Sequence, residues 1–81
     1  MKKIIGIVNP FELKQDLYVY EDNVKIDAVQ PNLDQLSKAI FALAEQYDIQ
    51  EITIKGPKTY VNGLLKNSTG YANKNLKITI L

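Results

Sequence analysis

The stretch Lys3-Ile4-Ile5-Gly6-Ile7-Val8-Asn9-Pro10 sets how the rest of this 81-residue chain can be arranged. It is a short run of mostly β-branched residues that ends at a turn signal, which is typical of a strand buried on both faces. We therefore expect it to be the central strand of a sheet. A chain of this length forms one hydrophobic core, so we expect residues 1–81 to be a single domain packed around that strand.

The segment that follows has the pattern of a β-hairpin. Residues 16–20 and 24–28 alternate between aliphatic side chains and polar or tyrosine side chains, as half-buried strands do. The residues at 22–23 supply the chemistry of a two-residue turn. In that register Val19 faces Ile26, which places the aliphatic side chains of the hairpin on one side of the sheet.

A helix is predicted next, because residues 33–47 carry apolar side chains at helical spacing. We expect Asn32 to cap its first turn and Gln35 to reach back in a capping box. The side chains predicted to face the core are Leu33, Leu36, Ile40, Leu43 and Tyr47.

The remaining residues predict a strand, a helix and a second strand. Residues 51–55 alternate as a strand does, and Gly56-Pro57 is typical of a helix start. We expect this helix to end near Asn67, residues 68–75 to form a loop, and residues 76–81 to form the last strand.

The elements thus follow the order β-β-β-α-β-α-β, which predicts an α/β fold with a five-stranded mixed sheet and two helices. Right-handed crossovers make the last two strands parallel. Each of these strands is apolar on one side and polar on the other, so we expect both helices to cover the same face.

This order resembles the ribonuclease H-like fold, which is shared by ribonucleases H, Holliday-junction resolvases and the halves of actin-like ATPases. The first strand, Lys3–Val8, also looks like the first strand of the resolvases, where an Ile-Gly-Ile run leads into a metal-binding aspartate. The corresponding position here is Val8, followed by Asn9. The fourth strand ends in Lys55-Gly56, without the acidic residue that such nucleases carry there. The resemblance therefore implies the fold without its catalytic carboxylates, because a two-metal nuclease needs several of them around its ions.

The composition excludes several common kinds of catalytic and metal site. His and Cys are both absent, which removes the usual general base near neutral pH, thiolate metal sites and Ser-His or Cys-His pairs. The acidic residues Asp16, Glu21, Asp22 and Asp27 match no calcium loop, and turn chemistry accounts for them. We therefore expect no catalytic residue, no metal and no cofactor, which favours a protein that is not an enzyme.

The charge pattern gives little information about partners. All ten basic residues are lysines, so the planar guanidinium fork that reads phosphate or guanine is missing. The formal net charge of +1 is too small to indicate nucleic-acid binding by itself.

Location and origin are expectations from the same sequence. No apolar run approaches the roughly 18 residues of a membrane helix, and Asn9-Pro10 interrupts any signal-peptide core, so we expect a cytoplasmic protein with no membrane partner. Lys, Asn and Ile are abundant whereas Arg and Trp are absent, a bias that AT-rich codons produce. This bias favours a low-GC bacterium or one of its phages or mobile elements.

One candidate site is the start of the second predicted helix, where free amides and the helix dipole could hold an anion. The residues of this anion-binding or ligand-binding candidate are Lys55, Gly56, Lys58 and Thr59. The alternative is that Gly-Pro simply starts a helix, since the spacing of a Walker loop is missing.

A second candidate site is the outer face of the sheet, which would present tyrosines among lysines. Its candidate residues are Tyr18, Tyr20, Lys25 and Lys77. Such a face could stack bases and hold phosphates, or it could pack against a second copy of the chain. Phe11-Glu12-Leu13, in the loop before the hairpin, could be a further contact point or could fold back over the core.

The function favoured by these features is a noncatalytic protein-interaction or self-association module, with a homo-oligomer or a protein partner. The alternative is a protein that binds a nucleotide or nucleic acid through the helix start at Gly56–Thr59 and the lysine-tyrosine face.

Overall fold

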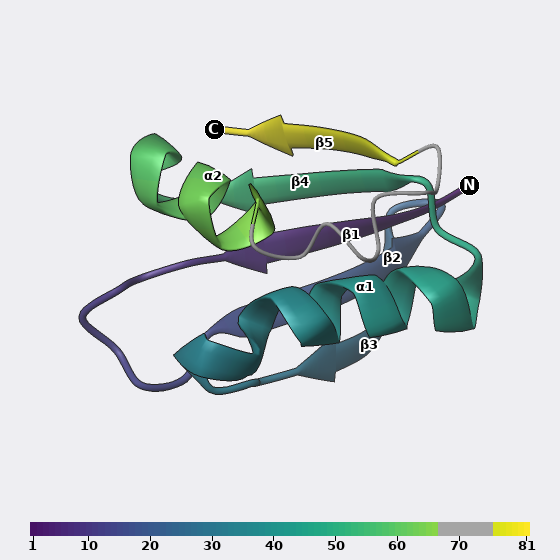
Figure 1. Ribbon diagram of the computed structural model, residues 1–81. Coiled ribbons are helices and arrows are strands. Elements are labelled where there is room, and N and C mark those ends of the chain that lie inside the picture. Colours follow the sequence, from purple (N-terminus) through teal and green to yellow (C-terminus); the bar gives the residue numbers. More distant parts are fainter. Residues whose placement is uncertain (67–75) are drawn as a thin grey trace.

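A computed structural model describes residues 1–66 and 76–81 of the chain (Figure 1). Its elements are β1 (Lys2–Ile7), β2 (Asp16–Glu21), β3 (Val24–Val29), a 3-10 turn (Leu33–Gln35), α1 (Leu36–Tyr47), β4 (Glu51–Lys55), α2 (Lys58–Lys66) and β5 (Lys77–Ile80). The predicted order β-β-β-α-β-α-β is confirmed. The loop expected at residues 68–75 and the helix end expected at Asn67 lie outside the described residues.

The five strands form one mixed sheet in the order β3-β2-β1-β4-β5. β1 is the middle strand, as predicted, and it pairs antiparallel with β2 and parallel with β4. β3 pairs antiparallel with β2, and β5 pairs parallel with β4. The two crossovers therefore join parallel strands, and the predicted parallel pairing of the last two strands is confirmed.

Both helices lie on the same face of the sheet, which confirms the expectation from the last two strands (Figure 1). A single core fills the space between them and the sheet. Its members include Ile4, Leu17, Val19, Ile52 and Ile54 from the strands, Leu36, Ile40, Leu43 and Ala44 from α1, and Val61 from α2. Each strand contributes alternate residues to this core, because successive side chains of a strand point to opposite faces.

The expectation that β1 is buried on both faces is wrong. Ile4 is fully buried under the helices, whereas Ile5 is half-buried and Ile7 remains 42% exposed. The reason is the number of helices: two helices on one face leave the other face of the middle strand without a covering layer among the described residues.

The hairpin turn is confirmed, but the register beyond it differs from the prediction. Asp22 and Asn23 have φ angles of 50° and 70°, the two positive values that a two-residue type I′ turn needs. A β-bulge then shifts the pairing, so that Val19 lies opposite Asp27 rather than Ile26. The aliphatic residues of β3 are therefore not all on the core side, and Ile26 is exposed.

The predicted capping box at the start of the first helix is also wrong. The Asn32 side chain makes no capping hydrogen bond, and the helix begins with a 3-10 turn. Backbone contacts fix the start of the helix instead. Asn32 forms a β-bridge with Lys14, and the Leu33 N–H donates to the Leu13 carbonyl at 2.9 Å. None of the described helices has the length and apolar character needed to cross a bilayer.

Candidate functional site

The carboxyl end of β1 is where the resolvase-like resemblance would place a metal-binding aspartate. Val8 occupies this position and is only 5% exposed. Its N–H donates to the Lys55 carbonyl at 2.8 Å, which ties β1 to the end of β4. Gly56 lies against it so closely that a Cβ added there would be 2.9 Å from the Val8 carbonyl oxygen and 3.4 Å from Val61. A closed contact of Val8, Gly56 and Val61 therefore occupies the place where the resemblance would put the metal-binding aspartate.

Carboxylates do not gather elsewhere in the part of the chain that the structure describes. Within residues 1–66 and 76–81, no group of three or more His, Cys, Asp or Glu residues could hold a metal ion. The Asn9 side chain, next to Val8, is engaged in the loop, where its Oδ1 accepts a hydrogen bond from the Phe11 N–H at 3.0 Å. These residues do not provide the charge that a two-metal reaction needs.

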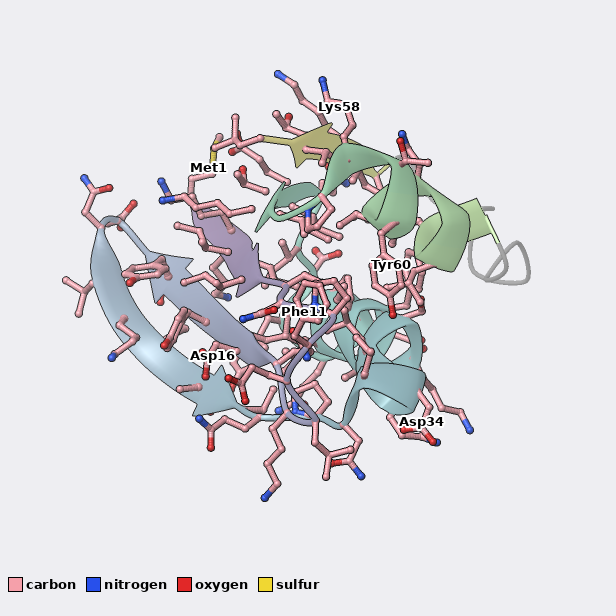
Figure 2. All side chains as sticks on the ribbon, turned by 90° about the vertical axis from the view of Figure 1, so that its left-hand side faces the viewer. Met1, Phe11, Asp16, Asp34, Lys58 and Tyr60 are labelled. Carbon is pink, nitrogen blue, oxygen red and sulfur yellow. The ribbon has the colours of Figure 1, made fainter. Side chains whose placement is uncertain are left out.

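The loop between β1 and β2 is held by one buried side chain, Gln15, which is 1% exposed. Its Nε2 donates to the carbonyls of Asn9 and Glu12 at 2.9 and 2.8 Å, and its Oε1 accepts from the Asn9 N–H at 2.6 Å. The loop does not fold back over the core: Phe11 is 95% exposed, and Leu13 is exposed too. In Figure 2, which looks onto this end of the molecule, Phe11 lies in front of the sheet and the helices.

The anion-binding candidate is divided between two faces of the sheet. Lys55 follows the fully buried Ile54 in β4, so its side chain points away from the helices. Lys58 and Thr59 are exposed at the first turn of α2, on the helix side. The Gly56 N–H is directed at the Leu81 carbonyl of the neighbouring strand end, at 3.4 Å. The structure therefore does not bring Lys55 together with Lys58 around the helix start.

The face of the sheet opposite the helices, which we call the open face, carries the second candidate site. The register places its strand residues in rows: Lys25, Tyr20, Lys3, Glu51 and Lys77 in the first, Ala28, Tyr18, Ile5, Thr53 and Thr79 in the second, and Asp16, Ile7 and Lys55 in the third. All four predicted residues of this site therefore lie on one face. Figure 2 shows the helices on one side of the sheet and side chains of the strands on the other.

The tyrosines and Lys25 form a cluster, from which Lys77 is distant. The Lys25 Nζ lies 5.1 Å from the centroid of the Tyr18 ring, within the range of a cation–π contact. Tyr20 lies opposite Lys25 across the β2–β3 pair. Lys77 is on β5, at the other edge of the sheet, with β1 and β4 between it and the cluster.

The sequence prediction missed the aliphatic part of this face. Ile5 lies between Tyr18 and Thr53 in the register, and Ile7 lies between Asp16 and Lys55. A signal was present in the sequence: every position from Ile4 to Val8 is apolar or glycine, so both faces of β1 (Lys2–Ile7) carry apolar side chains, whereas both helices are predicted to cover a single face.

Two polar contacts fasten the margins of the sheet away from this face. The Met1 ammonium lies 2.6 Å from an Asp22 carboxylate oxygen and holds the pKa of Asp22 below its usual value. The Tyr47 hydroxyl donates to Asp27 at 2.6 Å, which fastens α1 to β3 and raises the pKa of Tyr47, because the bond favours the neutral phenol.

Comparison with known proteins finds likeness in structure only. No family model and no curated protein sequence matches the chain. The nuclease domain of the large terminase subunit gp2 of bacterial virus Sf6 superposes with a TM-score of 0.74 at 10% identity, covering 99% of this chain and 36% of that one. A calcium-containing structure of a mutant of the same terminase subunit gives a TM-score of 0.75 at 11% identity, covering 99% and 37%.

A second kind of protein shares the same arrangement. A Bacteroides thetaiotaomicron protein with an actin-like ATPase fold and unknown function superposes with a TM-score of 0.74 at 16% identity, covering 99% of this chain and 32% of that one. The chain thus spans about a third of the length of these solved proteins. Identities this low establish the fold alone. The chain has a ribonuclease H-like fold, as its order of elements predicts, and Val8 is buried at the end of its first strand.

Proposed function

We propose that this chain is a noncatalytic interaction domain that binds a protein, either a second copy of itself or a different partner, on the open face of its sheet. The observation that carries this proposal is the apolar centre of that face. Ile5 and Tyr18 are neighbours in the register, Ile7 lies one row away, and no described element packs over them. Contiguous apolar surface with a polar margin is typical of sites where proteins associate.

A change at the centre of the open face tests this function. Replacing Ile7 with serine is expected to weaken association at least about tenfold, because it removes aliphatic contact from the middle strand of the open face. Ala42→Ser, at an exposed position on α1, is the matched control and is expected to leave association unchanged. Sedimentation velocity at micromolar concentration measures both, for each variant alone and for each variant mixed with Lys25→Glu/Lys77→Glu protein. Association in either form that is indifferent to Ile7→Ser would count against the open face.

The noncatalytic part of the proposal is supported by the closed contact of Val8 with Gly56. Incubation with DNA and Mg²⁺ or Mn²⁺ is expected to give no cleavage. Metal-dependent cleavage that disappears in Asp27→Asn would contradict this expectation, because it would require a carboxylate site that the described residues do not show.

A phage or mobile-element origin belongs to the same proposal. The lysine-rich, arginine-free composition supports it, and so does the viral source of the terminase subunit that shares the fold. The terminase domain that shares the fold is a nuclease; for the present chain we propose the same scaffold without that activity.

Binding of single-stranded nucleic acid or a nucleotide is the second candidate function. It is favoured by Lys25 and Lys55 on the same face as Tyr20, and by Lys58 and Thr59 at the first turn of α2. Titration with single-stranded DNA would then show an affinity that falls with added salt and with Lys55→Glu and Lys58→Glu. Wild-type protein without salt-sensitive binding would remove this candidate.

A further inference from the structure

We infer that the partner of the open face is an acidic protein surface with an apolar centre, and not a second copy of this chain. This inference rests on the proposed function and chooses between its two branches. It follows from the sign and the placement of the charges on the open face.

The net charge of the open face is positive. Its strand residues include four lysines, Lys3, Lys25, Lys55 and Lys77, against two carboxylates, Asp16 and Glu51. The face therefore has a net charge of +2, four positive against two negative, although the whole chain has only +1. In the described residues, no ion pair neutralises any of these lysines. Any two copies meeting face to face would bring together surfaces of the same sign, which opposes association.

The charges are placed where an interface has its rim. Lys25 lies on the edge strand β3 and Lys77 on the edge strand β5, Lys3 lies in the first row near the start of β1, and Lys55 ends β4 in the third row. Ile5 lies in the middle row of the middle strand, and Ile7 ends that strand beside Lys55. Interfaces between proteins commonly have this arrangement, with an apolar centre and a polar margin. The complementary surface would present apolar side chains inside a margin of Asp and Glu.

The same residues favour a protein over nucleic acid. The Tyr18 ring, at the centre of the face, already has the Lys25 ammonium over it at 5.1 Å, so that side of the ring is not available to stack a base. Its neighbours Ile5 and Ile7 offer aliphatic contact rather than an aromatic platform. The absence of arginine removes bidentate phosphate contacts.

A charge-reversed variant of this chain can serve as the acidic partner with an apolar centre. The double variant Lys25→Glu/Lys77→Glu keeps the apolar centre and changes the net charge of the face from +2 to −2, since each substitution replaces one positive charge with one negative charge. Wild type and variant are each expected to sediment as monomers. Their equimolar mixture is expected to form a one-to-one complex that weakens about tenfold or more between low and high salt.

The matched control is Lys38→Glu/Lys58→Glu, which makes the same change of net charge on α1 and α2, away from the open face. It is expected to form no complex with wild type. A complex with this control would overturn the inference, because it would show attraction between net charges rather than recognition by the open face. Equally, single-stranded DNA that displaces the charge-reversed variant from wild type would assign the face to nucleic acid.

Two further outcomes separate this inference from the proposed function. Wild type that self-associates as strongly as the mixture would overturn the inference and leave the interaction function standing. A mixture that stays monomeric at low salt would overturn both, because neither like nor opposite charge would then have produced association through this face.

Discussion

The two faces of the sheet are built from the same strands and differ in what covers them. On β1, Ile4 faces the helices and is fully buried, whereas Ile7, three residues later, faces the opposite way and is 42% exposed. The covered face is apolar at its core, with the Asp27 carboxylate bonded to the Tyr47 hydroxyl at its edge, and the open face combines an aliphatic centre with lysines at its margin. The difference shows that an apolar side chain in a strand is not by itself a sign of the core: the covering layer decides which face stabilises the fold and which remains for a partner.

The largest expected effect comes from replacing one isoleucine on each face of the sheet with alanine and comparing the two losses of stability. Ile4→Ala is expected to reduce the free energy of unfolding by about 2–5 kcal/mol, because it removes buried contacts and leaves a cavity under the helices. Ile7→Ala is expected to cost less than about 1 kcal/mol, since its side chain is already partly in water. Urea unfolding measures both. Equal losses in the two variants would show that the open face is packed in solution.

A smaller effect is expected from two glycines on the helix side. Gly56→Ala places a Cβ 2.9 Å from the Val8 carbonyl oxygen and is expected to destabilise the fold by roughly 1–3 kcal/mol. Gly63→Ala meets no atom within 4 Å and lies inside α2, so it is expected to stabilise by about 0.5–1 kcal/mol. Thermal unfolding of both variants tests the closed contact at the end of β1. A stabilised Gly56→Ala would mean that this end is open enough to admit a ligand.

The smallest effect concerns the bond between α1 and the edge strand β3. The folded state raises the pKa of Tyr47 above its ordinary value of 10.0, because the neutral phenol donates to Asp27. A raised pKa gives stability that is complete below pH 10.0 and is lost as the pH rises through the folded-state pKa. Tyr47→Phe is therefore expected to be slightly less stable than wild type at neutral pH, with the gap closing above pH 10.0. A gap that is constant with pH would show that this hydrogen bond does not form in solution.

The elements of the fold follow from local patterns, which explains why their order was predictable. The turn at Asp22-Asn23 and the apolar spacing of α1 are both encoded by neighbours in sequence. The β-bulge between β2 and β3 is not, and the residue that follows it, Asp27, accepts a hydrogen bond from the Tyr47 hydroxyl of a helix 20 residues away. The same applies to Asn32, whose role is set by its bridge to Lys14 and not by the capping pattern.

The candidate site was predictable in part for the same reason. Alternation along β2 places Tyr18 and Tyr20 on one face, whatever covers the other. It could not show that Ile5 and Ile7 share that face with them, because a continuous apolar run has no polar side. Lys55 and Lys58 are separated because α2 packs on the face of the sheet opposite the Lys55 side chain. Which face a helix covers is decided by the assembled sheet and not by the residues next to it in sequence.

The most direct test of the central claim, that one face holds the fold and the other receives a partner, is an isoleucine-methyl NMR titration. Labelled wild type would be titrated with unlabelled Lys25→Glu/Lys77→Glu protein. The methyl resonances of Ile5 and Ile7 are expected to shift, whereas those of Ile4, Ile52 and Ile54 under the helices are expected to stay in place. Shifts confined to the buried isoleucines, or spread equally over both groups, would contradict the assignment of the open face as the interaction surface.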